Sequence, residues 1–105
     1  MSASIFEKAA DFHGHLGPYL AIGVKMGLLA KKLLGCDGLS GMRVLAKTGS
    51  KPPKSCVVDG IQVSTKCTLG KGNIEVADLG ELVAEFWRGE TVSYTHLTLP
   101  TTERV

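Results

Sequence analysis

Residues 12–19 read Phe-His-Gly-His-Leu-Gly-Pro-Tyr, and a largely apolar run follows them as far as Leu34. Two glycines interrupt regular structure in this stretch, and Pro18 suits the first turn of a new helix, where its missing N–H would have no partner. The apolar run covers nearly every side of that helix, which predicts a helix buried on two sides. Gly23 and Gly27 within it would let a second backbone come close.

On either side of this stretch, the remaining segments have the periodicities of short helices and strands. The predicted elements are, in order, a helix over Ser4–Phe12, a helix over Tyr19–Leu34, a strand over Met42–Lys47, a helix capped by Ser55 and running through Val63, and strands over Ile74–Ala77 and Leu82–Trp87. This order predicts an α+β fold with mixed helices packed on a small sheet, in one domain that covers residues 1–91.

The composition is that of an ordinary globular protein, with 44% hydrophobic and 21% charged residues in a chain of 105. Its net charge of +2 is too small to indicate a nucleic-acid partner. The longest apolar stretch is too short for a membrane span and carries Lys25. Because the first ten residues show no export signal, we expect a cytoplasmic protein without membrane contact.

Three cysteines in a chain without a secretory signal favour thiols or metal ligands over a disulfide framework. Cys56 and Cys67 could not bind one ion from a single unbroken helix, since eleven residues span about 16 Å. Two zinc-bound sulfur atoms lie within about 4 Å of each other. Either the helix ends near Ser64 and the chain doubles back, or Cys67 packs locally. Cys36, in a polar turn, is interpreted as incidental.

His13 and His15 are two residues apart, which places both imidazoles on one side of an extended backbone. The flanking glycines and Pro18 favour that conformation. Two neutral imidazoles that face one point form half of a site for zinc, nickel or iron. The alternative is a hydrogen-bonded turn without metal.

Cys56 comes directly after the predicted cap, where the positive end of the helix dipole favours the thiolate as a metal ligand or nucleophile. Asp59 shares its side of the helix and could orient an imidazole or take a proton; a solvated first-turn acid is the alternative. Lys71, in Gly70-Lys-Gly-Asn73, is a candidate for binding an anionic cofactor, with a plain tight turn as the alternative.

Residues 92–105 do not continue the pattern and resemble the translation of an adapter used to build sequencing libraries. We therefore predict a non-native tail in which His96 has no role, with an authentic polar tail as the alternative. On this interpretation the strand that ends near Trp87 has an exposed edge.

Taken together, residues 12–27 and the stretch Ser-Cys-Val-Val-Asp-Gly-Ile-Gln-Val-Ser-Thr-Lys-Cys-Thr-Leu-Gly-Lys-Gly-Asn over residues 55–73 resemble the FmdE family of formylmethanofuran dehydrogenase proteins. The resemblance covers about residues 3–90. It implies an intracellular α+β domain, often dimeric, with a metal site built from the His-Gly-His segment and the cysteine-bearing helix. Its implied site residues are His13, His15, Cys56, Asp59 and Cys67.

The resemblance also implies a setting beside a molybdenum or tungsten oxidoreductase that fixes carbon dioxide as a formyl group on methanofuran, the first step of methanogenesis. Expected partners are a second copy of the chain and other dehydrogenase subunits, and the expected cofactor is a divalent metal, zinc before nickel or iron. The alternative is a non-catalytic dimerisation module with structural cysteines. Many relatives have Cys in place of Gly17 and Gly in place of Lys66, at a turn that needs a flexible residue.

Overall fold

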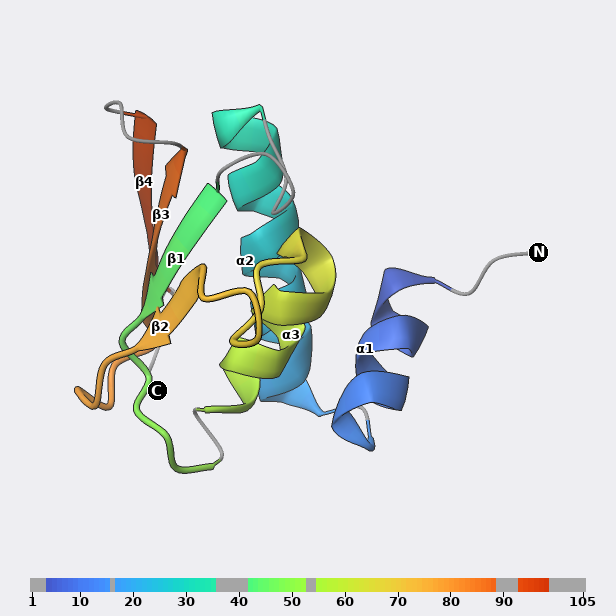
Figure 1. The fold of residues 1–105 in the computed structure, drawn as a ribbon. Helices are drawn as coiled ribbons and strands as arrows, with labels where there is room; N and C mark the ends of the chain where they lie inside the picture. The colour runs from blue at the N-terminus through green and yellow to red at the C-terminus, as the bar shows by residue number, and fades with distance from the viewer. Residues whose placement is uncertain (1–3, 16, 36–41, 53–54, 89–92, 99–105) are drawn as a thin grey trace.

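A computed structural model describes residues 4–15, 17–35, 42–52 and 55–88 in full and the backbone of residues 93–98. The elements are α1 (Ile5–His13), α2 (Pro18–Leu34), β1 (Met42–Ala46), α3 (Cys56–Thr65), β2 (Ile74–Val76), β3 (Val83–Arg88) and β4 (Ser93–Thr98), as Figure 1 shows. The first six confirm the predicted order and the α+β fold.

The strands form one mixed sheet in the order β2-β1-β3-β4. β1 pairs in parallel with β2, with Val44 opposite Ile74, and antiparallel with β3, with Val44 opposite Phe86. Since parallel neighbours need a crossover connection, α3 lies between β1 and β2 in the chain. Both parallel strands therefore end on the side of the molecule where α3 begins.

The prediction of an exposed edge on β3 was wrong. β4 pairs antiparallel with β3 over its whole length, from Val83 opposite Thr98 to Arg88 opposite Ser93. The physical reason lies in the segment Tyr-Thr-His-Leu-Thr over residues 94–98, because aromatic and β-branched residues favour strands. The side chain of His96 lies outside the described residues. That residues 92–105 are non-native stays a prediction.

The helices cover one face of the sheet, and α2 and α3 lie between the sheet and α1 (Figure 1). The larger apolar cluster joins α2 and α3 to the sheet, where Met42, Ile61 and Phe86 are fully buried. A smaller cluster of Ala9, Leu20 and Val24 joins α1 to α2. Two apolar contacts thus fix α3 relative to the sheet and α1 relative to α2, so that the end of α1 comes to lie beside α3.

The α2–α3 contact depends on glycine. A Cβ built on Gly23 would overlap the carbonyl oxygen of Val57, and one on Gly60 would overlap backbone atoms of Leu20 and Val24. A Cβ on Gly27 would overlap the side chain of Ser64 in the same way. The close backbone approach that the sequence predicted is therefore confirmed, and Gly60 on α3 takes part in it.

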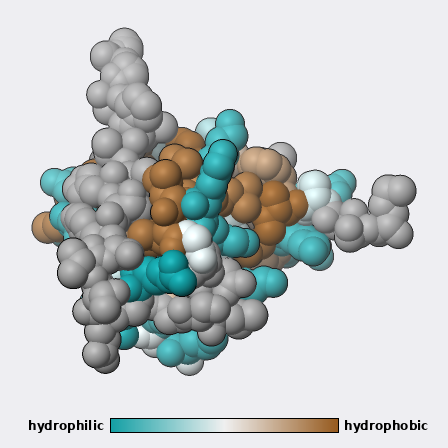
Figure 2. Space-filling model, turned by 90° about the horizontal axis from the view of Figure 1, so that it is seen from above, coloured by the Kyte–Doolittle hydropathy of each residue, from teal (hydrophilic) through white to brown (hydrophobic). Residues whose placement is uncertain are grey.

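The outer face of α2 stays exposed. Leu28, Leu29 and Leu33 keep 37%, 44% and 57% of their surface accessible. Figure 2, which looks at the molecule from above, shows apolar surface in the middle of this face. Within the described part of the chain, no helix is long and apolar enough to cross a membrane.

Candidate functional site

The end of α1 brings the two histidines together. A capping box between Ser4 and Glu7 begins the helix, and Gly14 ends it in the left-handed conformation with φ 112°. His13 is the last helical residue and His15 follows the turn, with the ring centroids 4.8 Å apart. The predicted extended backbone was wrong. The left-handed glycine reverses the chain and places the rings edge to face.

Cys56 is the first residue of α3, and Asp59 follows one turn later on the same side of the helix. Ser55 precedes the helix, but its backbone has αR geometry and its side chain makes no capping hydrogen bond. The prediction that Ser55 caps the helix was therefore wrong in its chemistry, because a side-chain cap requires an extended N-cap residue.

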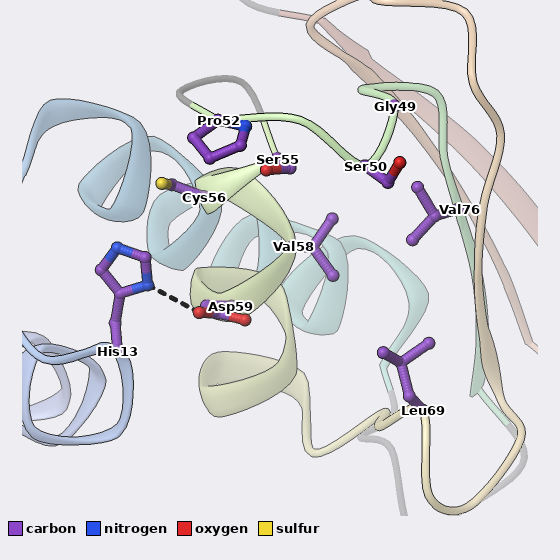
Figure 3. A pocket seen from close by; sticks show the side chains of 10 residues that line it. All are labelled: His13, Gly49, Ser50, Pro52, Ser55, Cys56, Val58, Asp59, Leu69 and Val76. Carbon is purple, nitrogen blue, oxygen red and sulfur yellow. Dashed lines mark hydrogen bonds and ion pairs between the residues drawn. The ribbon is translucent and has the colours of Figure 1, made fainter.

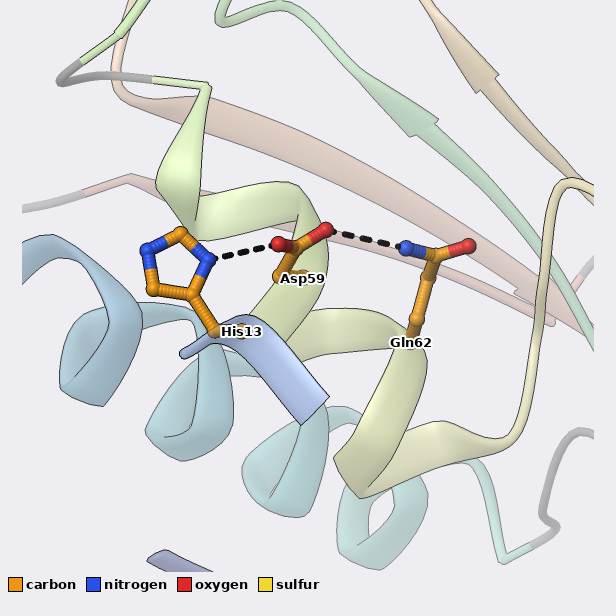
Figure 4. Close-up of polar contacts among 3 residues, drawn as sticks. All are labelled: His13, Asp59 and Gln62. Atoms are coloured by element: carbon orange, nitrogen blue, oxygen red, sulfur yellow. Dashed lines mark hydrogen bonds and ion pairs between the residues drawn. The ribbon is translucent and has the colours of Figure 1, made fainter. Parts of the chain in front are cut away.

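His13 and Asp59 form the central contact of the site, with 2.6 Å between His13 Nδ1 and Asp59 Oδ2 (Figures 3 and 4). Their side chains are 13% and 34% exposed, so water competes only partly for this bond. Because a carboxylate only accepts, the Nδ1–H of His13 donates, and Nε2 carries the lone pair. In Figure 3 this second nitrogen is on the side of the ring toward Cys56.

Gln62 extends the contact by one more step (Figure 4). Its Nε2 donates to Asp59 Oδ1 at 3.3 Å, and its Oε1 accepts from the backbone N–H of Leu69 at 3.0 Å. The side chain is 8% exposed. The sequence indicated only that Gln62 shares the side of Asp59; its bond to Leu69 depends on where the chain runs after α3.

Two cavities meet at His13 and Cys56. The larger, of about 360 Å³, is lined by these two residues, by Val58 and Asp59 on α3, and by Leu69 and Val76 (Figure 3). It lies at the carboxyl ends of the parallel strands, which is where open α/β sheets commonly bind ligands. The smaller, of about 200 Å³, lies between His13, His15, Cys56 and the start of α2.

The donor types at this junction suit a borderline divalent ion, since two imidazoles and a thiol line one cavity. The bond from Asp59 to His13 is the carboxylate contact that usually orients a metal-binding imidazole. Among the described residues, however, no group of three or more His, Cys, Asp or Glu is placed to hold an ion. Ligation by His13, His15 and Cys56 together would therefore need side-chain rotation.

The structure does not bring Cys67 to this site. The helix ends at Thr65, Lys66 takes the left-handed conformation with φ 68°, and Cys67 turns into the core at 0% exposure. Its sulfur lies 3.4 Å from the carbonyl oxygen of Met42, to which the thiol donates. The predicted set of His13, His15, Cys56 and Cys67 is thus not assembled, because the chain continues toward β1 instead of doubling back. Cys36 lies outside the described residues.

Lys71 lies in a tight turn away from both cavities. The backbone N–H of Lys71 donates to Thr68, and that of Gly72 donates to Leu69 O at 3.1 Å. Asn73 Oδ1 accepts from the N–H of Thr68 at 2.8 Å. Since these N–H groups are used within the turn, the structure has the tight turn of the alternative interpretation where the sequence offered an anion cradle.

Comparison with known proteins identifies relatives for most of the chain. An Archaeoglobus fulgidus protein named "Probable S-adenosyl-L-methionine-binding protein" is 38% identical over 78 residues, which are 70% of this chain and 20% of that protein. A solved FmdE-like protein of tungsten formylmethanofuran dehydrogenase, from Syntrophus aciditrophicus, shares the fold, with a TM-score of 0.59 and 23% identity. The match covers 83% of this chain and 45% of that one.

The chain therefore spans a fifth of the archaeal relative and less than half of the solved one. The model of the family described as "FmdE, Molybdenum formylmethanofuran dehydrogenase operon" matches residues 12–104. This range contains the His-Gly-His segment, α3 and the turn after it, so the chain belongs to the FmdE family.

Proposed function

We propose that this chain is a metal-binding domain that holds one divalent ion, zinc before nickel or iron, at the junction of the two cavities. The ligands are His13 through Nε2, His15 and Cys56. The observation that carries the proposal is the His13–Asp59 hydrogen bond, because it leaves the metal-binding nitrogen of His13 on the side of Cys56. A bound ion would supply Lewis acidity to a molecule in the larger cavity.

The residues around the ion have separate roles in this proposal. Asp59 keeps the His13 ring in place and is the group that could take a proton, and Cys56 is the sulfur donor with nucleophilic character. Val58 and Leu69 give the larger cavity apolar walls that hold an organic substrate beside these groups.

The family description supports a setting in formylmethanofuran metabolism, beside a molybdenum- or tungsten-dependent dehydrogenase in the cytoplasm. We infer that the domain assists such an oxidoreductase as one of its subunits and contacts the others. Genomic neighbours that encode further dehydrogenase subunits would support this assignment.

Elemental analysis of anaerobically purified protein tests the metal site. We expect near-stoichiometric divalent metal in the wild type and its loss in Cys56→Ser. Cys67→Ala is the matched control, because Cys67 is buried away from both cavities and its loss should leave the metal content unchanged. Metal-free wild-type protein, or metal lost from Cys67→Ala and kept in Cys56→Ser, would contradict the proposal.

The exposed leucines of α2 favour a second candidate, a homodimerisation or assembly module in which the cysteines are structural. This function needs no metal. It therefore predicts metal-free protein that dimerises normally, and unchanged assembly in Cys56→Ser.

A further inference from the structure

The amide of Gln62 lies between two groups whose hydrogen-bonding roles are fixed. On one side is the backbone N–H of Leu69, which can only donate. On the other is the carboxylate of Asp59, which can only accept. These two neighbours assign the amide without ambiguity: Oε1 faces Leu69, and the N–H₂ faces Asp59.

The same logic continues to His13. Asp59 Oδ1 receives the N–H of Gln62, so the carboxylate is held with Oδ2 toward His13 Nδ1. A carboxylate in this orientation accepts from Nδ1–H, and a neutral imidazole with its proton on Nδ1 has its lone pair on Nε2. The donor at Leu69 therefore determines, through two side chains, which nitrogen of His13 is protonated.

We propose that Gln62 is a positioning residue that fixes His13, through Asp59, in the Nδ1–H tautomer and so presents the Nε2 lone pair to the cavity shared with Cys56. The tautomer follows from the hydrogen bonds alone, whereas the consequence for metal affinity rests on the proposed function. Gln62 contacts no group that lines the smaller cavity and acts only through Asp59.

Burial makes this relay effective. Gln62 is 8% exposed, so water cannot readily replace either of its bonds, and an unpaired Asp59 Oδ1 would have to rotate toward solvent. The same amide anchors the backbone of Leu69, whose side chain lines the larger cavity. One side chain thus holds both the orientation of the imidazole and a wall of the neighbouring cavity.

The test is Gln62→Met, which keeps the length of the side chain and removes both hydrogen bonds. Long-range ¹H–¹⁵N spectra in mildly alkaline buffer, where free imidazole is neutral, report the tautomer of each histidine. We expect the Nδ1–H form of His13 in the wild type and a mixture of both forms in the variant. Competition with a chromophoric chelator should show zinc affinity about 10-fold to 100-fold weaker, the usual effect of losing a contact behind a ligand.

Thr65→Val is the matched control, because it removes a buried hydrogen bond to Ile61 on the same helix without touching Asp59. We expect it to lower stability and leave the His13 tautomer unchanged. The proposal is overturned if Gln62→Met keeps the wild-type tautomer, or if Thr65→Val shifts it equally. A wild type that binds no zinc would overturn the proposed function, while the spectra would still decide the role of Gln62.

Discussion

At the scale of single residues, the site depends on an oriented carboxylate. Asp59 accepts from His13 with one oxygen and from Gln62 with the other, so both oxygens face donors. In Asp59→Asn the new amide must turn its N–H₂ toward one of these donors, and one contact is lost whichever way it faces. We expect zinc affinity about 10-fold to 100-fold weaker, measured by chelator competition.

Glu75→Gln is the control for charge in this measurement. Glu75 is an exposed carboxylate on β2 that lines neither cavity, so its loss changes the net charge by the same amount. Equal losses of affinity in both variants would show that charge, not the orientation of His13, is what Asp59 supplies.

Lys66 carries a second residue-scale prediction. Its φ of 68° is the one positive value among the described non-glycine residues, and a Cβ in this conformation costs about 1–2 kcal/mol. Lys66→Gly relieves this strain at the end of α3, although glycine also gains freedom in the unfolded chain. We expect the free energy of unfolding to rise by about 0.5–1 kcal/mol in urea titrations. A decrease would mean that the lysine side chain stabilises the turn by more than its backbone costs.

At the scale of elements, local signals predicted the fold well. Pro18 begins α2 and Gly35 ends it, as the sequence indicated, and the six predicted elements all form. The site was less predictable. The bond between His13 and Asp59 joins residues 46 positions apart and exists only because α1 packs beside α3, and the direction of Cys67 depends on a left-handed lysine that no local pattern indicates.

The α2–α3 contact gives a prediction at this scale. In Gly60→Ala the new methyl group would overlap the backbone of Leu20 and Val24, which cannot move without separating the helices. We expect a loss of about 1–3 kcal/mol or more in the free energy of unfolding, from chemical denaturation. Gly70→Ala is the control, since nothing lies within 4 Å of its added Cβ and its φ is not positive. Equal stability of the two variants would contradict this packing.

At the scale of the whole molecule, the layered arrangement covers the inner faces of α2 and leaves its outer face without a described neighbour. The sheet and α3 cover one part of the helix and α1 covers another, while Leu28, Leu29 and Leu33 stay accessible. Neighbouring exposed leucines on one helix mark a surface that gains free energy when it is covered. We therefore expect the proposed homodimer to form through this face.

Leu29→Lys tests that expectation. A lysine at this position would bring a charge into the apolar contact and remove a side chain whose burial stabilises by about 1.5–3 kcal/mol, so the variant should be monomeric where the wild type is dimeric. Sedimentation velocity over a range of concentrations measures the change. Leu79→Lys is the control, because Leu79 is 59% exposed and lies away from α2. A wild type that stays monomeric, or a Leu79→Lys variant that dissociates equally, would show that the α2 leucines do not hold two copies together.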